Sequence, residues 1–376
     1  MTADHLPDLR RTSTHRHRRR TRALRPLLLL AVLASIVTAC GGEDTEATGP
    51  TAGGPAGDAV ELGGEVRMGR ATWATGHFQA AVYQQLLEEL GYDVIDPAEA
   101  TRSPATFYPA LVQGRFDLWA NGWFPLHEPF LEGERLTGES YEQPIEPVGV
   151  QVGDGAVQGY LVDRATAEAL DITSMEDLSR PEVRDAFDQD GDGRAEVYGC
   201  EDGWGCNLVI DAHLEQLSWG SQAEQIVGDY DALMADALER IAEGEPTLFY
   251  TWTPNWTTGV LVPGEDVLWL ESPALPDQDR STSVEGLPGC AAADPCQLGW
   301  VVNDIRAVAN TDFLEENPPV RRLLEQVTIP LPDIAAQNAR MEAAEEYTEE
   351  DLHADAEAWI AANRADVDGW LERARG

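Results

Sequence analysis

Three of the eleven tryptophans occupy positions from which their aromatic faces could surround a cation. Trp123 and Trp252 lie where two predicted strands end, and Trp204 lies in a short segment between two cysteines. In α/β sheets, the carboxyl ends of the strands face the ligand crevice. A trimethylammonium group has no N–H to donate, but an indole face attracts it by about 2 kcal/mol or more once water is excluded. The three tryptophans therefore indicate a site for a quaternary ammonium group.

Packing is the competing explanation for each tryptophan taken alone. A core tryptophan normally belongs to an apolar, periodic run, and we interpret four of the others in this way: Trp219, Trp269, Trp359 and Trp370. The three candidates instead lie at strand or loop ends close to glycine or proline. Their shared placement, and not any one of them, favours a common site.

Donors for a negatively charged end of the same ligand lie close by in the sequence. The backbone N–H groups around Gly203 and Gly205 can approach a carboxylate because neither residue carries a Cβ. His127 follows Trp123 by four residues and could add an N–H donor, although a surface or helix-capping histidine would fit the same sequence. An ammonium cage with carboxylate donors predicts a zwitterionic ligand.

The five cysteines divide into Cys40 and two pairs, Cys200/Cys206 and Cys290/Cys296, each spaced C-x5-C. In an exported protein, two small disulfide loops are the simplest interpretation. Metal binding is the alternative, but neither pair has a nearby histidine or the C-x2-C spacing of zinc sites. A bridge within the first pair would hold the segment around Trp204 and stabilise the fold by roughly 2 kcal/mol.

An acidic segment has the D-x-D-x-D-G start of a calcium loop. Asp188, Asp190 and Asp192 would be its first, third and fifth ligands, and Glu196 follows at the ninth position. The twelfth position is Gly199, so the usual bidentate glutamate is missing. The alternative is an acidic turn between a helix and a strand. We expect no cofactor other than a candidate structural calcium ion here.

The first 39 residues have the order of a bacterial lipoprotein signal. Arginines precede an apolar run over residues 27–36, and modest-sized residues lead to Cys40. We expect cleavage before Cys40, lipidation of its sulfur, and a flexible tether over residues 40–63, which are rich in glycine, alanine, threonine and proline. An ordinary signal peptide with an incidental cysteine is the alternative.

Composition excludes several classes of protein. Apolar residues make up 43% of the chain, which rules out a disordered chain, and no apolar run reaches the roughly 18 residues of a spanning helix. The net charge is −41 and lysine is absent, so nucleic acid and anionic lipid surfaces are excluded as partners. Such a surface suits high salt, where screening relieves self-repulsion.

Short apolar strands alternate with helical stretches from residue 64 onward, which predicts a largely parallel sheet covered on both faces. The expected strands are 65–71, 92–95, 116–120, 159–162, 247–251 and 267–270, and the expected helices are 78–90, 108–113, 230–242, 351–363 and 367–373.

Five segments carry a resemblance to a known family, in order along the chain: GWFPLHEPF, AVQGYLVD, DGDGRAEVYGCEDGWGC, FYTWTPNW and LPDIAAQNARM. They look like the substrate-binding component of the glycine betaine/proline betaine ABC importer, from about residue 64 to the C-terminus. The resemblance places the family's aromatic box on Trp123, Trp204 and Trp252. It places the carboxylate contacts on His127 and on the backbone of Gly205 and Cys206. The second cysteine pair departs from the family pattern.

The resemblance also implies a fold and partners. The fold would be the α/β, two-lobed, type II periplasmic-binding-protein (Venus-flytrap) fold, with two hinge crossings. Lobe 1 would comprise residues 64–157 and 300–376, and lobe 2 residues 158–299. The protein would lie lipid-anchored on the extracytoplasmic face of the membrane, and deliver betaine to an ABC permease and its ATPase for osmoprotection.

Three other functions remain open from the residues. A binding protein for choline, carnitine or another small zwitterion is the nearest, but choline has no carboxylate to use the donors. An extracellular enzyme is disfavoured because the sequence has no G-x-S-x-G, H-E-x-x-H or Walker motif, and its cysteines are expected to be oxidised. A purely structural calcium-binding protein leaves the placement of the tryptophans unexplained.

Overall fold

The computed structural model of the chain describes residues 63–131 and 145–376. The predicted signal peptide, the lipidation site Cys40 and all of the tether except its last residue lie outside the described residues. In the two described ranges, no helix is both long enough and apolar enough to cross a membrane.

Lobe 1 is built on parallel strands that begin with β1 (Glu65–Ala71), which pairs with β2, β3 and β4. Buried apolar side chains such as Phe78, Val82 and Leu86 hold the first helix in the core of this lobe. That helix ends at Gly91, whose φ of 106° lies in the left-handed region that favours glycine. The other strands are β2 (Asp93–Ile95), β3 (Thr101–Arg102) and β4 (Leu118–Phe124).

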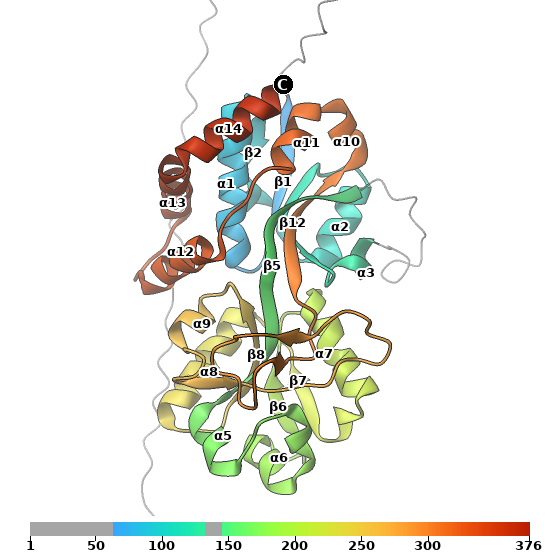
Figure 1. Cartoon of the computed structure of the whole chain (residues 1–376), viewed down its shortest axis with the longest axis vertical. Helices are drawn as coiled ribbons and strands as arrows, with labels where there is room; N and C mark the ends of the chain where they lie inside the picture. The colour runs from blue at the N-terminus through green and yellow to red at the C-terminus, as the bar shows by residue number, and fades with distance from the viewer. Residues whose placement is uncertain (1–62, 132–144) are drawn as a thin grey trace, which may run out of the picture. The chain divides into compact units, whose positions relative to one another are not determined.

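The helices of lobe 1 come from both ends of the described chain (Figure 1). From the N-terminal part come α1 (Thr75–Leu90), the 3-10 turn η1 (Pro97–Ala100), α2 (Pro104–Val112) and α3 (Glu128–Leu131). From the C-terminal part come α10 (Thr311–Glu316), α11 (Pro318–Leu324), α12 (Leu331–Ala343), α13 (Glu349–Ala362) and α14 (Arg364–Arg375).

Lobe 2 has its own strands, with helices around them. Its strands are β6 (Ala195–Tyr198), β7 (Ala223–Ile226), β8 (Leu248–Thr253) and β9 (Val267–Trp269), with a separate pair β10 (Ser283–Val284) and β11 (Cys296–Gln297). Its helices are α5 (Arg164–Leu170), η2 (Met175–Ser179), α6 (Pro181–Phe187), α7 (Gly205–Gln216), η3 (Trp219–Ser221), α8 (Tyr230–Glu243) and α9 (Thr257–Val260).

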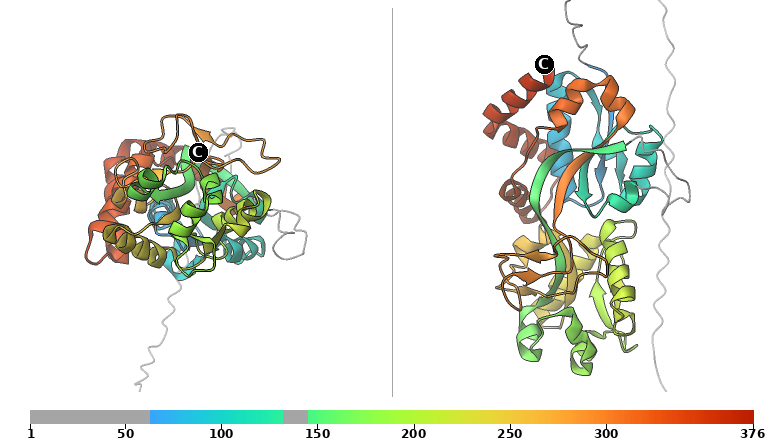
Figure 2. Two further views of the ribbon diagram at one scale, coloured as in Figure 1. Left: turned by 90° about the horizontal axis from the view of Figure 1, so that it is seen from below. Right: turned by 45° about the vertical axis from the view of Figure 1, so that its right-hand side comes forward.

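Two strands connect the lobes, β5 (Ile145–Asp163) and β12 (Asn303–Asn310). The first part of β5 pairs with β12, and its last part pairs with β8 and β9 of lobe 2. Figures 1 and 2 show β5 running from one lobe into the other, with β12 beside it. The resulting sheet has the order β2-β1-β4-β12-β5-β8-β6-β7. The two-lobed α/β fold predicted from the sequence is therefore confirmed.

The expectation of a largely parallel sheet is wrong at its centre. The β1–β4 and β6–β8 pairs are parallel, but β12 is antiparallel to both β4 and β5, and β5 is antiparallel to β8. The physical reason lies in the connection, because the chain leaves lobe 1 along β5 and returns along β12 in the opposite direction. The sheet is therefore mixed.

Both expected disulfides are present, Cys200–Cys206 and Cys290–Cys296. The first closes the loop that leads into α7, and the second joins the loop between β10 and β11 to the start of β11. The four tryptophans that we assigned to packing are all buried: Trp219, Trp269, Trp359 and Trp370.

Candidate functional site

One cavity is bordered by all six residues that the sequence assigned to ligand binding. Lobe 1 supplies Trp123 and His127, and lobe 2 supplies the others: Trp204, Gly205, Cys206 and Trp252. Two of the tryptophans lie inside strands and not after them, because β4 continues to Phe124 and β8 continues to Thr253. The roles of these residues toward a ligand remain predictions.

The Trp204 ring stands at a steep angle to the rings of Trp252 and Trp73. The ring centroids of Trp204 and Trp252 are 5.7 Å apart, and their planes meet at 78°. Trp73 meets Trp204 from the other lobe with a centroid separation of 5.1 Å and an angle of 72°. Rings in this arrangement form adjoining walls, and a tetrahedral ammonium group can contact several of them at once.

Four residues that sequence reasoning did not select also border the cavity: Trp73, Leu126, Gln158 and Tyr250. Trp73 follows β1, so the criterion applied to the other tryptophans, a position at the carboxyl end of a strand, would have found it. Gln158 on β5 pairs with Trp252 on β8, and the hydroxyl of its diagonal neighbour Tyr250 donates to Gln158 Oε1 at 2.6 Å. Nothing in the local sequence of these buried strand positions marks them as lining a cavity.

One amide oxygen orients two of the indoles. Asn121 Oδ1 accepts from Trp73 Nε1 at 2.9 Å and from Trp123 Nε1 at 2.8 Å. The Asn121 amide in turn donates to Gln79, which donates to Gln151 on β5. All five side chains are buried, so this chain of hydrogen bonds fixes the lobe 1 part of the site from within its own lobe.

His127 is buried, with 2% of its surface exposed, which excludes the surface histidine considered from the sequence. Its Nδ1 accepts from the backbone N–H of Trp123 at 3.2 Å and lies 3.0 Å from the Tyr108 hydroxyl, which can donate to it. The proton of the neutral ring is then on Nε2, which makes that atom a donor. Burial lowers the pKa of His127 to about 3, so the imidazole is uncharged at neutral pH.

The amino end of α7 lies at the cavity through Gly205 and Cys206. The first N–H groups of a helix have no acceptor within the helix, and they carry the positive end of its dipole. Glycine is required here, because a Cβ on Gly205 would lie 2.6 Å from Leu126 Cγ. The Cys200–Cys206 disulfide joins this helix end to the part of the loop that follows β6. The arrangement suits a carboxylate.

The walls of the cavity are neutral, but carboxylates lie behind them. Trp204 and Trp252 also border a second cavity, which is lined by Glu201, Asp229 and Asp231 among others. Burial and mutual repulsion raise the pKa values of Glu201 and Asp231. These charges make the surroundings of the cage negative without placing an anion against the ligand.

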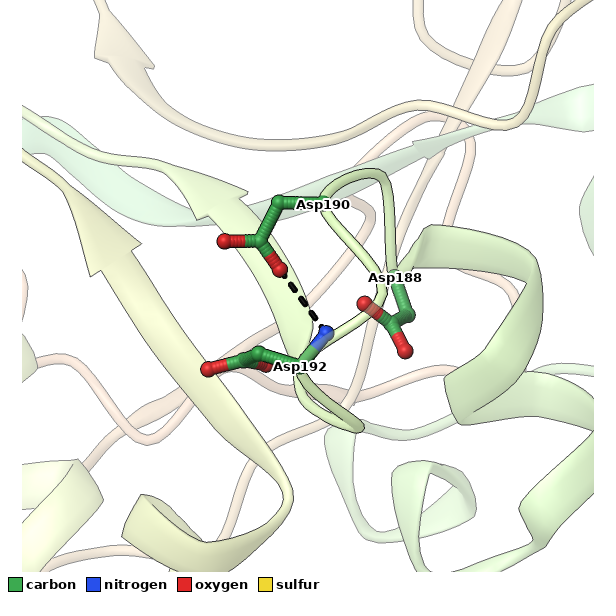
Figure 3. Close-up of side chains that lie close together, drawn as sticks. All are labelled: Asp188, Asp190 and Asp192. Atoms are coloured by element: carbon green, nitrogen blue, oxygen red, sulfur yellow. Dashed lines mark hydrogen bonds between the residues drawn. The ribbon is translucent and has the colours of Figure 1, made fainter.

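The acidic loop brings three of its four predicted metal ligands together. Carboxylate oxygens of Asp188, Asp190 and Asp192 lie within 4.8 Å of one another. Figure 3 shows the three side chains close together. The Asp188 carboxylate accepts from two backbone N–H groups of the loop, and Asp192 pairs with Arg194. The Glu196 carboxylate lies near those of Asp190 and Glu224, in a second set of three whose oxygens are within 4.8 Å of one another. Calcium binding by this loop remains a prediction.

Comparison with known proteins points to one family. The model of a family described as the substrate binding domain of ABC-type glycine betaine transport systems matches residues 64–362. The glycine betaine-binding periplasmic protein OusX of Dickeya dadantii is 37% identical over 312 residues, which cover 82% of this chain and 90% of OusX. The glycine betaine/proline betaine-binding periplasmic protein of Salmonella typhimurium is 36% identical over 330 residues, which cover 87% of this chain and 95% of the relative.

Solved structures share the fold at lower identity. Lactococcal OpuAC, in its closed conformation with glycine betaine, matches with a TM-score of 0.59 and 18% identity over 82% of this chain and 99% of its own. A choline-binding protein of an ABC transporter, in complex with choline, matches with a TM-score of 0.61 and 19% identity over 82% of this chain and 91% of its own. The family match over residues 64–362 and the identity to full-length relatives show that this chain belongs to the substrate-binding domains of ABC-type glycine betaine transport systems.

Proposed function

We propose that the protein captures glycine betaine or proline betaine between its lobes and delivers it to an ABC importer. The observation that carries this proposal is the cavity itself, in which four tryptophans meet a neutral histidine donor and the amino end of a helix. The tryptophans would surround the quaternary ammonium, and His127 Nε2 and the N–H groups of Gly205 and Cys206 would bind the carboxylate. OusX is a glycine betaine-binding protein, and the Salmonella typhimurium relative is a glycine betaine/proline betaine-binding protein.

Choline is the second candidate, because one structural neighbour is a choline-binding protein. Choline has the same trimethylammonium group, so the cage alone does not separate the two ligands. It has no carboxylate, however, and its binding would leave the His127 donor and the end of α7 without a charged acceptor. Unpaired buried donors cost free energy, which favours a zwitterion.

The protein would act outside the cytoplasm, as the periplasmic relatives do. We propose that Cys40 carries the lipid that holds it at the membrane and that residues 40–63 form the tether. The test is expression of the wild type and of Cys40→Ala in a bacterial host fed a labelled fatty acid. Label on the wild type alone supports the anchor, and label on neither or on both contradicts it.

Intrinsic tryptophan fluorescence provides the test of ligand identity, because the proposed walls are themselves the fluorophores. The purified protein is titrated with glycine betaine, proline betaine, choline and proline. We expect saturable responses to both betaines, affinity for choline lower by about tenfold or more, and no response to proline, which has no methyl groups on its nitrogen. Absence of a betaine response contradicts the proposal, and tighter binding of choline favours the second candidate.

A further inference from the structure

A hydrogen bond from one wall of the cage crosses between the lobes. Trp204 Nε1 donates to Thr72 Oγ1 at 2.7 Å. Trp204 precedes α7 in lobe 2, whereas Thr72 lies in lobe 1, in the loop between β1 and α1. The indoles of Trp73 and Trp123, which border the same cavity, donate to Asn121 within lobe 1. The orientation of Trp204 therefore depends on contact between the lobes, and that of the lobe 1 tryptophans does not.

The same hydroxyl lies near a second residue of the disulfide loop. Thr72 and Glu201 border one cavity, and the Thr72 hydroxyl acts to lower the pKa of the Glu201 carboxyl against the larger effect of burial, which raises it. A threonine hydroxyl has one proton to donate and lone pairs to accept with, so it can donate toward Glu201 while it accepts from Trp204. Thr72 therefore lies near both ends of the Cys200–Cys206 loop.

Lobe 1 also meets this loop through its backbone. Ala105 N, at the start of α2, donates to Gly203 O at 3.2 Å. Gly203 has a φ of 83°, which favours glycine, and a Cβ at this position would press against lobe 1, 3.0 Å from Ser103 Oγ. Lobe 1 therefore forms hydrogen bonds with two of the loop's residues, Gly203 and Trp204.

We infer that Thr72 is a positioning residue, which holds Trp204 in its place as a cage wall only while the lobes are closed. This inference rests on the proposed function, since the wall matters only for a cage. Opening the lobes must break the Thr72–Trp204 bond, because its two ends belong to different lobes. Ligand contact with Trp204 and lobe closure consequently support each other, and the hydroxyl slows release of the bound ammonium compound.

The test compares Thr72→Val, which keeps the shape but removes the hydroxyl, with Thr72→Ser, which restores it. Thr101→Val is the matched control, because the Thr101 hydroxyl bonds only to Arg70 and Ala98 of its own lobe. Stopped-flow fluorescence measures association and release of glycine betaine. Thr72→Val should release it about tenfold faster, as for loss of one hydrogen bond. Association should change by less than about threefold.

Thr72→Ser should return the release rate to within about twofold of the wild type, and Thr101→Val should not change it. An unchanged release rate in Thr72→Val, the same increase in Thr101→Val, or no rescue by serine would overturn the inference. Failure of the wild type to bind glycine betaine would instead contradict the proposed function. In that case single-molecule FRET between dyes on the two lobes still tests the contact: the wild type should spend more time closed than Thr72→Val, and equal populations would overturn it.

Discussion

The indole rings of Trp204 and Trp252 meet at 78°, with their centroids 5.7 Å apart, although one precedes a helix and the other lies near the end of a strand. A disulfide holds the backbone beside the first ring, and the strand ladder of β5 and β8 holds the second. Two independently supported rings therefore form a corner.

Replacing Trp252 with leucine should remove one wall while leaving an apolar side chain in its place. We expect glycine betaine affinity to fall by about 2 kcal/mol, roughly 30-fold, because leucine has no π face for the cation. Isothermal titration calorimetry measures the loss. Trp359→Leu is the control, since Trp359 is also buried but donates to Asp333 and borders none of the cavities described above. Equal losses in the two variants would contradict the role of Trp252.

The His127→Leu variant should bind glycine betaine less tightly without a matching loss of affinity for choline. Glycine betaine should lose about tenfold in affinity, because a donor to its carboxylate is removed. Choline has no carboxylate, so whatever affinity it has should stay within about twofold of the wild-type value. Calorimetry with both ligands on both proteins checks this difference, and parallel losses for the two ligands would show that His127 acts only by packing.

Acid should destabilise the fold below about pH 6.5 because three histidines are partly or fully desolvated in the folded chain. Burial lowers the pKa of His77 to about 4, that of His127 to about 3 and that of His213 to about 4. The unfolded chain takes up protons near the ordinary value of 6.5, while the folded chain stays neutral, so stability falls as pH drops from 6.5 toward 4. Thermal unfolding of the wild type and of His77→Gln, between pH 6.5 and 4, measures this loss of stability. The variant should lose less stability over this window, and an identical pH dependence would exclude His77 as a contributor.

The two disulfides should differ in their effects on ligand affinity and on the melting temperature. Changing Cys200 and Cys206 to serine should weaken glycine betaine binding several-fold, because the loop that carries Trp204 and the α7 end becomes free to move. Changing Cys290 and Cys296 to serine should lower the melting temperature with little effect on affinity, since neither residue borders the cavity. Calorimetry and thermal unfolding of both double variants separate the two outcomes, and a reversed pattern would refute the assignment.

Much of this structure follows from local sequence patterns, and the exceptions have physical causes. The expected strand 65–71 and helix 230–242 match β1 and α8 closely, because alternation and helical periodicity are local properties. The 19 residues of β5 were predicted only as 159–162, since a strand that passes between two lobes changes its environment along its length. The antiparallel centre of the sheet depends on chain return, which no local pattern records.

Some residues of the site could likewise be predicted from the sequence, and others could not. Trp123, Trp204 and Trp252 could be found because tryptophans at strand and loop ends are unusual, and His127 because it follows one of them. Gln158 could not be found, because a buried polar residue on a strand has the same local sequence whether it faces a cavity or a partner.

The most direct test of the cage is the affinity difference between glycine betaine and 3,3-dimethylbutanoate, in which carbon replaces the quaternary nitrogen. The two molecules have the same shape and the same carboxylate, so only the positive charge distinguishes them. With several cation–π contacts of about 2 kcal/mol each, calorimetry should show glycine betaine binding at least about a hundredfold more tightly. Equal affinity for the two compounds would contradict the tryptophan cage.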